Sequence, residues 1–194
     1  MSDYRFVLAD TPELRRLPFE RMEAEGMTRA VLWHRARPTL VDWLEGVNPL
    51  NAVLYLAYDG EELAGAAWLN PVVGCSGFVH FAIFKGARPD WHRLGREAIG
   101  KLFLVLALKS LLAFWPAHFR HVGRAAAYWG FGEPLLVPGG CPMPTRARPG
   151  RCRDGCMAVL TREKFMNRFP GGNDGQCGDF SFRGRAERAR ARGL

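Results

Sequence analysis

The sequence has no long apolar run. No stretch of apolar residues is longer than Leu102 to Leu108, far below the roughly 20 residues that a membrane-spanning helix needs. The first residues, Met-Ser-Asp-Tyr-Arg-Phe, lack the apolar segment of a secretory signal peptide. No internal repeat is visible. We therefore expect a cytoplasmic protein that makes no membrane contact and is not built from repeats.

Cysteines are few and odd in number. The five are Cys75, Cys141, Cys152, Cys156 and Cys177. An odd number without a signal peptide favours reduced thiols over a disulfide framework. A structural zinc site prefers a two-residue spacer and a clear fourth ligand, but three residues separate Cys152 from Cys156 and no histidine lies near them in sequence. We favour small buried or loop thiols, and metal binding by Cys141, Cys152 and Cys156 stays open.

The end of the chain has arginines but few aromatic rings. Five arginines and one glutamate lie between Arg183 and Arg192, and they carry half of the net charge of +8. The rest of the chain is only mildly basic, which weakens a nucleic-acid role for it. Any nucleic-acid contact of the tail should be weak, sequence-independent and steeply salt-dependent. A solvated tail without a partner is the alternative that we favour.

Length and composition predict one globular domain. The chain has 194 residues, of which 48% are hydrophobic, and this is enough for one domain with a full core. We place that domain at residues 1–169. Residues 170–194 are Gly-rich and then Arg-rich, and we expect disorder there.

Apolar periodicity predicts strands and helices in alternation. Expected strands are Tyr4–Leu8, Ala52–Tyr58, Leu63–Leu69, Phe78–Phe84, Leu111–Trp115, Pro134–Val137 and Met157–Leu160. Expected helices begin at Thr11 and Thr161 and cover Thr39–Glu45, Trp91–Leu108 and Arg120–Tyr128, with Pro18 making the first one irregular. The segment Gly139–Gly155 is rich in Pro, Gly and Arg, which predicts a loop.

The stretch Gly77–Gly100 organises the chain. A β-branched and aromatic run gives way, at Gly86 and Pro89, to a basic loop and then to helical spacing from Trp91. A strand that leads through a basic loop to a helix N-terminus can bind phosphate, because free backbone N–H groups and the helix dipole point there. The alternative is an ordinary turn that binds nothing.

Two local patterns and the order of the elements resemble the acyl-CoA N-acyltransferase (GNAT) superfamily. Leu94-Gly95-Arg96 looks like the end of the family's pyrophosphate loop, and the segment 125–131, Ala-Ala-Ala-Tyr-Trp-Gly-Phe, looks like its late helix. More narrowly, Val79–Phe84, Pro116 and Gly130-Phe131 resemble GNAT-like proteins of phages and prophages. The resemblance covers roughly residues 4 to 165.

The resemblance implies an α/β (α+β) fold with a mixed, mainly antiparallel central sheet flanked by helices, and acetyl-CoA as co-substrate. The CoA-binding residues that it implies are Ala82, Ile83, Phe84, Arg88, Arg93, Leu94, Gly95 and Arg96. The family loop reads Gln/Arg-x-x-Gly-x-Gly/Ala, and of this pattern residues 90–95 keep only the last Gly. Asp90 adds a negative charge that is unfavourable beside a pyrophosphate unless it points away.

Acetyl transfer needs a base for the amine and an acid for the leaving thiolate. His80 lies on the central strand, where the family often has a carboxylate base, and imidazole titrates near neutrality. Tyr128 lies in the late helix, where the family often has a tyrosine acid. The alternative for His80 is a core or hydrogen-bonding histidine, and for Tyr128 a ring packed in the core.

The resulting prediction is an acetyl-CoA-dependent N-acetyltransferase that acts on an unidentified amine. The alternative is a non-catalytic protein of the same fold, such as a phage or prophage accessory protein, whose Arg-rich tail contacts nucleic acid.

Overall fold

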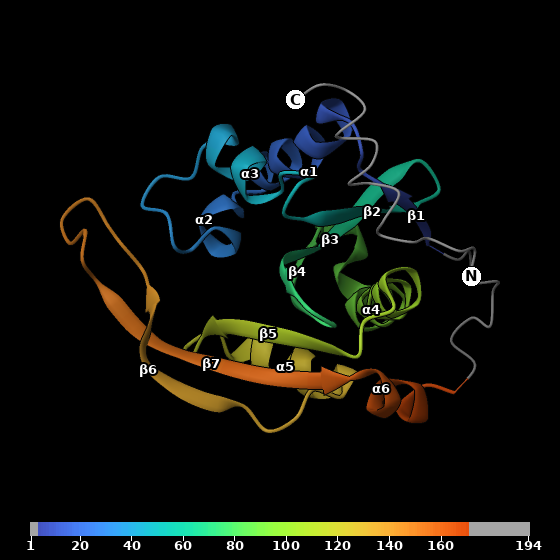
Figure 1. Ribbon diagram of the computed structural model, residues 1–194. Coiled ribbons are helices and arrows are strands. Elements are labelled where there is room, and N and C mark those ends of the chain that lie inside the picture. The colour runs from blue at the N-terminus through green and yellow to red at the C-terminus, as the bar shows by residue number, and fades with distance from the viewer. Residues whose placement is uncertain (1–3, 171–194) are drawn as a thin grey trace.

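The computed structural model describes residues 4–170, which form a seven-stranded sheet with helices on both faces (Figure 1). The order across the sheet is β1 (Arg5–Leu8), β2 (Val53–Asp59), β3 (Glu62–Val73), β4 (Ser76–Ile83), β5 (Ser110–Pro116), β7 (Cys152–Thr161) and β6 (Leu135–Pro142). Neighbouring strands are antiparallel except β4 and β5, which are parallel. The expected mixed, mainly antiparallel sheet is therefore present.

Three N-terminal helices cover one face of the sheet. They are α1 (Pro12–Ala24), α2 (Thr28–Val31) and α3 (Leu40–Gly46). Thr11 caps α1 as expected, since its hydroxyl accepts the Leu14 N–H at 3.3 Å. Under these helices the core contains Phe19, Trp43 and Trp68. Contrary to the expected irregularity, α1 runs unbroken through the buried Pro18.

The opposite face carries η1 (Lys85–Asp90), α4 (Trp91–Leu106), α5 (Arg120–Trp129) and α6 (Arg162–Arg168). Gly130 ends α5 in the left-handed conformation with φ +93°, which glycine adopts without steric cost. The core on this side contains Ile99 and Phe103 of α4, Trp129 of α5 and Phe165 of α6. The two cores lie on opposite sides of the same strands, because side chains alternate along a strand.

Strands β4 and β5 separate soon after they begin. They pair only at Ser76–Ser110, Gly77–Leu111 and Phe78–Leu112, whereas β4 continues to Ile83 and β5 to Pro116. Figure 1 shows β4 rising away from β5 toward the end of each strand. The sheet is therefore continuous at one end of this pair and open at the other.

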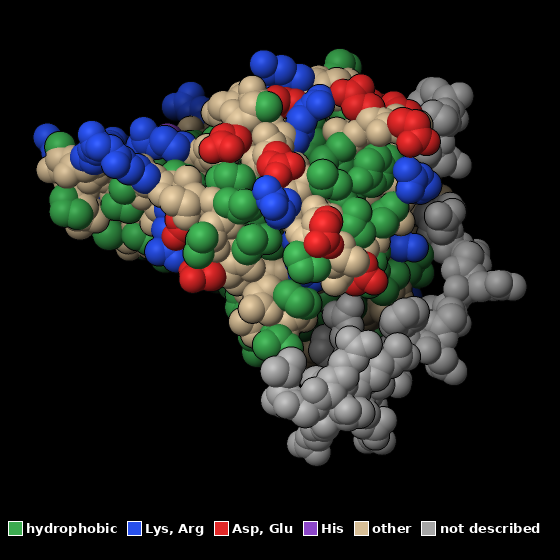
Figure 2. All heavy atoms as spheres, turned by 90° about the horizontal axis from the view of Figure 1, so that it is seen from above, with side chains coloured by type: hydrophobic (Ala, Val, Ile, Leu, Met, Phe, Trp, Pro, Cys, Tyr) green, Lys and Arg blue, Asp and Glu red, His purple; other side chains and the backbone are tan. Residues whose placement is uncertain are grey.

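A long hairpin replaces the loop expected at Gly139–Gly155. Strand β6 extends to Pro142 and β7 begins at Cys152, with Cys141 opposite Arg153. Proline is tolerated in β6 because this is an edge strand of the sheet. The hairpin projects beyond the rest of the domain in Figure 1, and Figure 2 shows Lys and Arg side chains gathered toward the end of that projection.

The predictions for the tail cannot be compared with this structure, since residues 171–194 lie outside the described part of the chain. Within the part that the structure describes, no helix is long and apolar enough to cross a membrane.

Candidate active site where two strands diverge

The backbone of β4 presents two amide groups at the open edge. The Phe84 N–H donates to Ala64 O of β3 at 2.9 Å, and in an antiparallel pair alternate residues turn their backbone groups to the same neighbour. The amides of Phe81 and Ile83 therefore point the other way, toward β5. Since β5 leaves β4 after Phe78, no described strand pairs with them there.

Because of this alternation, the three strand residues expected to contact CoA do not all present their backbone groups at the open edge. Ala82 and Phe84 turn their backbone groups toward β3, and their side chains lie in the core under the N-terminal helices. Ile83 presents its amide at the open edge. Phe81, which sequence reasoning did not select, does so too, and only the observed register of β4 against β3 reveals this.

The N-terminus of α4 follows β4 through η1, as expected. Within residues 4–170, no side chain caps it, so its first-turn N–H groups lack the usual side-chain acceptor. Asp90 is held on the side of Tyr4 and Arg93, with its carboxylate 3.4 Å from the Tyr4 hydroxyl and 3.4 Å from Arg93 Nη1. The positive charge of Arg93 thus offsets the negative charge that the sequence puts beside this helix end.

Arg93 has protein partners in place of the phosphate that the sequence suggests. Its Nε donates to Glu97 at 2.8 Å, and its guanidinium lies over the Tyr4 ring. The hydrogen bond to Glu97 and the nearby carboxylates raise the pKa of Arg93 above its usual value. With a side chain only 12% exposed, Arg93 ties α4 to the start of the chain.

Gly95 is needed for helix packing. A Cβ atom at this position would lie 2.0 Å from the Trp129 ring, so the glycine lets α5 approach α4. Leu94 is fully buried. Arg96 is exposed beside Phe169, and Arg88 contacts Glu25 at 3.4 Å. Of the predicted loop residues, Arg88 and Arg96 are those with exposed side chains.

His80 lies on the face of β4 that points to the N-terminal helices. Its ring stacks on Trp68, with centroids 5.2 Å apart and planes at 13°. Its Nε2 lies 3.0 Å from Asn70 O. Because a carbonyl only accepts, Nε2 carries a proton, and in the neutral ring Nδ1 is then an acceptor. Asn70 lies in the irregular part of β3, where the register against β4 shifts between Leu69 and Val72.

The surroundings of His80 keep its ring neutral. Burial lowers the pKa of the imidazole, the nearby His34 lowers it further, and the hydrogen bond to Asn70 opposes both. A neutral imidazole can accept a proton, which is the state that a general base needs. The geometry also fits a hydrogen-bonded core histidine, so His80 stays a candidate.

Tyr128 lies on the other side of the sheet. On α5 the inward positions are Ala126 and Trp129, and Tyr128 is 41% exposed. Its ring contacts Trp91 at 5.3 Å and His92 at 5.7 Å between centroids. The structure therefore places Tyr128 beside the N-terminus of α4 and does not bring it together with His80.

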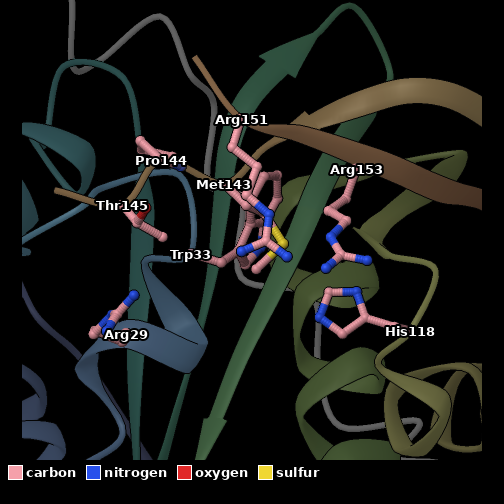
Figure 3. Close-up of a pocket in the computed structure, with 8 residues that line it drawn as sticks. All are labelled: Arg29, Trp33, His118, Met143, Pro144, Thr145, Arg151 and Arg153. Atoms are coloured by element: carbon pink, nitrogen blue, oxygen red, sulfur yellow. The ribbon is translucent and has the colours of Figure 1, made fainter. Parts of the chain in front are cut away.

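A pocket opens between α2, the end of β5 and the β6–β7 hairpin (Figure 3). Its lining residues are Arg29, Trp33, His118, Met143, Pro144, Thr145, Arg151 and Arg153. The Trp33 ring contacts His34 at 5.7 Å and Phe114 of β5 at 6.1 Å between centroids. The pocket thus lies on the helix side of the diverging strands, the side that His80 faces.

Sequence reasoning missed this pocket because it treated Gly139–Gly155 as a loop. The arginines of that segment were visible, but only strand pairing shows which of them face α2.

The cysteines of the hairpin are free thiols. Cys141 is buried, Cys152 is exposed and Cys156 is half-buried. Burial raises the pKa of Cys141 to about 11, so its thiol is protonated at neutral pH. Between residues 4 and 170 no group of three or more His, Cys, Asp or Glu side chains could hold a metal ion.

Comparison with solved structures identifies the fold. A spermidine N-acetyltransferase from Vibrio cholerae in complex with CoA and spermine is similar over 84% of this chain and 98% of its own, with a TM-score of 0.66 and 12% identity. RimJ from Mycobacterium smegmatis in complex with CoA-disulfide is similar over 87% of this chain and 88% of its own, with a TM-score of 0.64 and 12% identity.

A ribosomal-protein-S5-alanine acetyltransferase from Vibrio fischeri is similar over 85% of this chain and 96% of its own, with a TM-score of 0.60 and 12% identity. The sequence matches no protein-family model and no curated protein. The chain therefore has a GNAT-like fold, and at 12% identity the similarity is one of fold alone.

Proposed function

We propose that this protein is an acetyl-CoA-dependent N-acetyltransferase that acts on an amine. The observation that carries the proposal is the separation of β4 from β5 beyond Phe78, which leaves the amides of Phe81 and Ile83 facing an open edge. The same edge leads into the uncapped N-terminus of α4. These groups suit an extended ligand with amide groups and phosphates, which is the chemistry of CoA.

Acetyl-CoA would supply the activated acyl group at this edge. The amide of Phe81 or Ile83 would donate a hydrogen bond where negative charge develops on the carbonyl oxygen, and such fixed donors contribute strongly to catalysis. His80 would accept a proton from the amine at Nδ1, because Nε2 is committed to Asn70. Arg88 and Arg96 are the exposed cations of the loop that would contact phosphate.

Tyr128 remains a candidate acid. Its position beside Trp91 and His92 fits a role near the helix end better than one beside His80. One observation favours the non-catalytic alternative. Gly95 is the one residue of the family's loop pattern that this chain keeps, and its contact with Trp129 accounts for it through helix packing alone. The narrower resemblance to phage and prophage proteins stays a prediction, as does cytoplasmic localisation.

The test is acetyl-CoA binding followed by turnover. A ligand that binds only the folded state raises the melting temperature by mass action, so acetyl-CoA should do so and calorimetry should detect heat. His80→Ala should leave this shift unchanged and lower kcat by about 100-fold or more. No shift and no heat would contradict the proposal, and binding with no turnover on any amine would favour the non-catalytic alternative.

A further inference from the structure

The pocket between α2 and the hairpin is lined by arginines without a matching carboxylate. Arg29, Arg151 and Arg153 line it together with the His118 ring, and no Asp or Glu does. Elsewhere in the domain arginines have carboxylate partners, such as Arg21 with Glu62 at 2.8 Å. No ion pair joins the three pocket arginines to any described carboxylate. Like charges gathered around one small space repel each other unless an anion joins them.

The three arginines approach the space from two walls. Arg151 directly precedes β7 and Arg153 lies within it, and both line the pocket from the hairpin. Arg29 belongs to α2 on the facing wall. Figure 3 shows the Arg153 guanidinium beside the His118 ring and the Arg151 guanidinium beside Trp33 and Met143. A planar guanidinium matches the oxygen geometry of carboxylates and phosphates.

The size and position of the pocket suit one end of an acceptor. Its volume is about 160 Å³, below the 300 Å³ or so at which sites for whole drug-sized ligands begin. The Trp33 ring in its wall contacts the His34 ring, and His34 lies close enough to His80 to affect its pKa. A molecule anchored here would extend toward the divergence of β4 and β5.

We infer that the acceptor is an amine that also carries an anionic group, a carboxylate or a phosphate, and that Arg29, Arg151 and Arg153 bind this group. The inference rests on the proposed function and specifies its substrate class. A polycationic acceptor is excluded by the same charges. Trp33 and Met143 offer apolar surface to the carbon chain that joins the amine to the anion.

The experiment compares amines that differ only in the anionic group. Phosphoethanolamine is paired with ethanolamine, 4-aminobutyrate with butylamine, and spermidine serves as the polycation. Acetyl-CoA binding is measured first by calorimetry on the full chain. Binding of each amine to the protein–CoA complex and acetyl transfer to each are then measured, so that recognition is scored even for an amine that reacts slowly.

We expect the anionic member of at least one pair to be favoured by about tenfold or more in affinity or kcat/KM, the usual effect of a charged hydrogen bond. Comparison of the two pairs distinguishes a phosphate from a carboxylate. Arg151→Gln with Arg153→Gln should abolish the preference. Arg146→Gln with Arg148→Gln is the matched control, because it removes two exposed arginines of the same hairpin that do not line the pocket.

The outcomes distinguish failure of the inferred acceptor class from failure of the proposed function. If acetyl-CoA binds but the anionic amines show no advantage, or spermidine is preferred, the inference is overturned and the proposed function stands. If both double variants lose the preference equally, general surface charge explains it and the pocket does not. If acetyl-CoA does not bind, the proposed function fails and the inference fails with it. All variants should keep the parent melting temperature, since Arg146, Arg148 and Arg153 are exposed, Arg151 is only half-buried, and none of the four forms an ion pair with a described carboxylate.

Discussion

His80 links the candidate chemistry to the pH dependence of stability. Burial lowers its pKa in the folded state below the ordinary value of about 6.5. Between the folded and unfolded pKa values, the unfolded chain binds the extra proton, so the free energy of unfolding rises with pH across that window and levels off above it. The contribution of His80 is therefore present at neutral pH and lost as the solution is acidified.

We predict that His80→Gln flattens the fall in melting temperature between neutral pH and about pH 5. His121→Gln, at an exposed position, is the control and should leave the curve unchanged. If His80 is also the base, kcat of the parent should fall on acidification through the same lowered pKa. An unchanged stability curve in His80→Gln would mean that folding does not lower the pKa of the His80 ring.

Gly95 provides a second test at a single position. Gly95→Ala would bring a methyl group to 2.0 Å from the Trp129 ring, and such overpacking costs about 1–3 kcal/mol of unfolding free energy. Gly100→Ala in the same helix meets nothing nearer than Phe165 at 3.7 Å. That variant should be neutral or more stable by about 0.5–1 kcal/mol.

Denaturant unfolding of both variants measures these differences. Adding Trp129→Leu to Gly95→Ala should restore part of the loss, because the two residues share one contact. If instead Gly95→Ala keeps its stability and loses only acetyl-CoA binding, the glycine acts at the phosphates, as the sequence pattern first suggests.

At the scale of elements, the open edge of β4 predicts that proline substitutions at two adjacent positions of this strand destabilise the domain to different extents. Ile83→Pro removes an N–H that the β3–β4 ladder does not use, so the fold should survive while acetyl-CoA affinity falls. Ala82→Pro removes a group that faces β3, and this should destabilise the domain strongly. Ile83→Ala controls for the lost side chain. Equal destabilisation by the two prolines, measured by circular dichroism and thermal unfolding, would contradict the assigned register.

The sequence predicts most elements because their local signals agree with their packing. Thr11 and Thr161 cap helices, Gly130 ends α5, and Asp59-Gly60 joins β2 to β3. The hairpin escapes prediction because Pro and Gly within Gly139–Gly155 are typical of loops, while an edge strand accepts them. The contact of Arg93 with the Tyr4 ring and that of Gly95 with Trp129 depend on residues distant in sequence, which no local pattern encodes.

At the scale of the whole molecule, charge is unevenly distributed. The arginines of Arg146–Arg153 lie on the projecting hairpin (Figure 2), and those of Arg183–Arg192 lie outside the described residues. We predict that any binding of duplex DNA by the full chain is weak at low salt and lost at physiological salt, because counterion release would supply nearly all of it.

Comparison of the full chain with residues 1–170 at two salt concentrations, by fluorescence anisotropy, locates that binding. Removal of 171–194 should abolish it if the tail is responsible. Equal binding by both would assign it to the hairpin or to Arg88–Arg96, and Arg146→Gln with Arg148→Gln would then distinguish these two.

The short pairing of β4 with β5 has a mechanical consequence. The half-sheet β1–β4 and the half-sheet β5–β7–β6 share three residue pairs, beginning where the Ser76 and Ser110 hydroxyls lie 2.6 Å apart. The two halves resemble the arms of a hinge, joined at one end by this short seam and held on one side by α4. A ligand bound between the two half-sheets would restrain both of them. Its binding should therefore slow hydrogen exchange in both half-sheets, including strands that it does not contact.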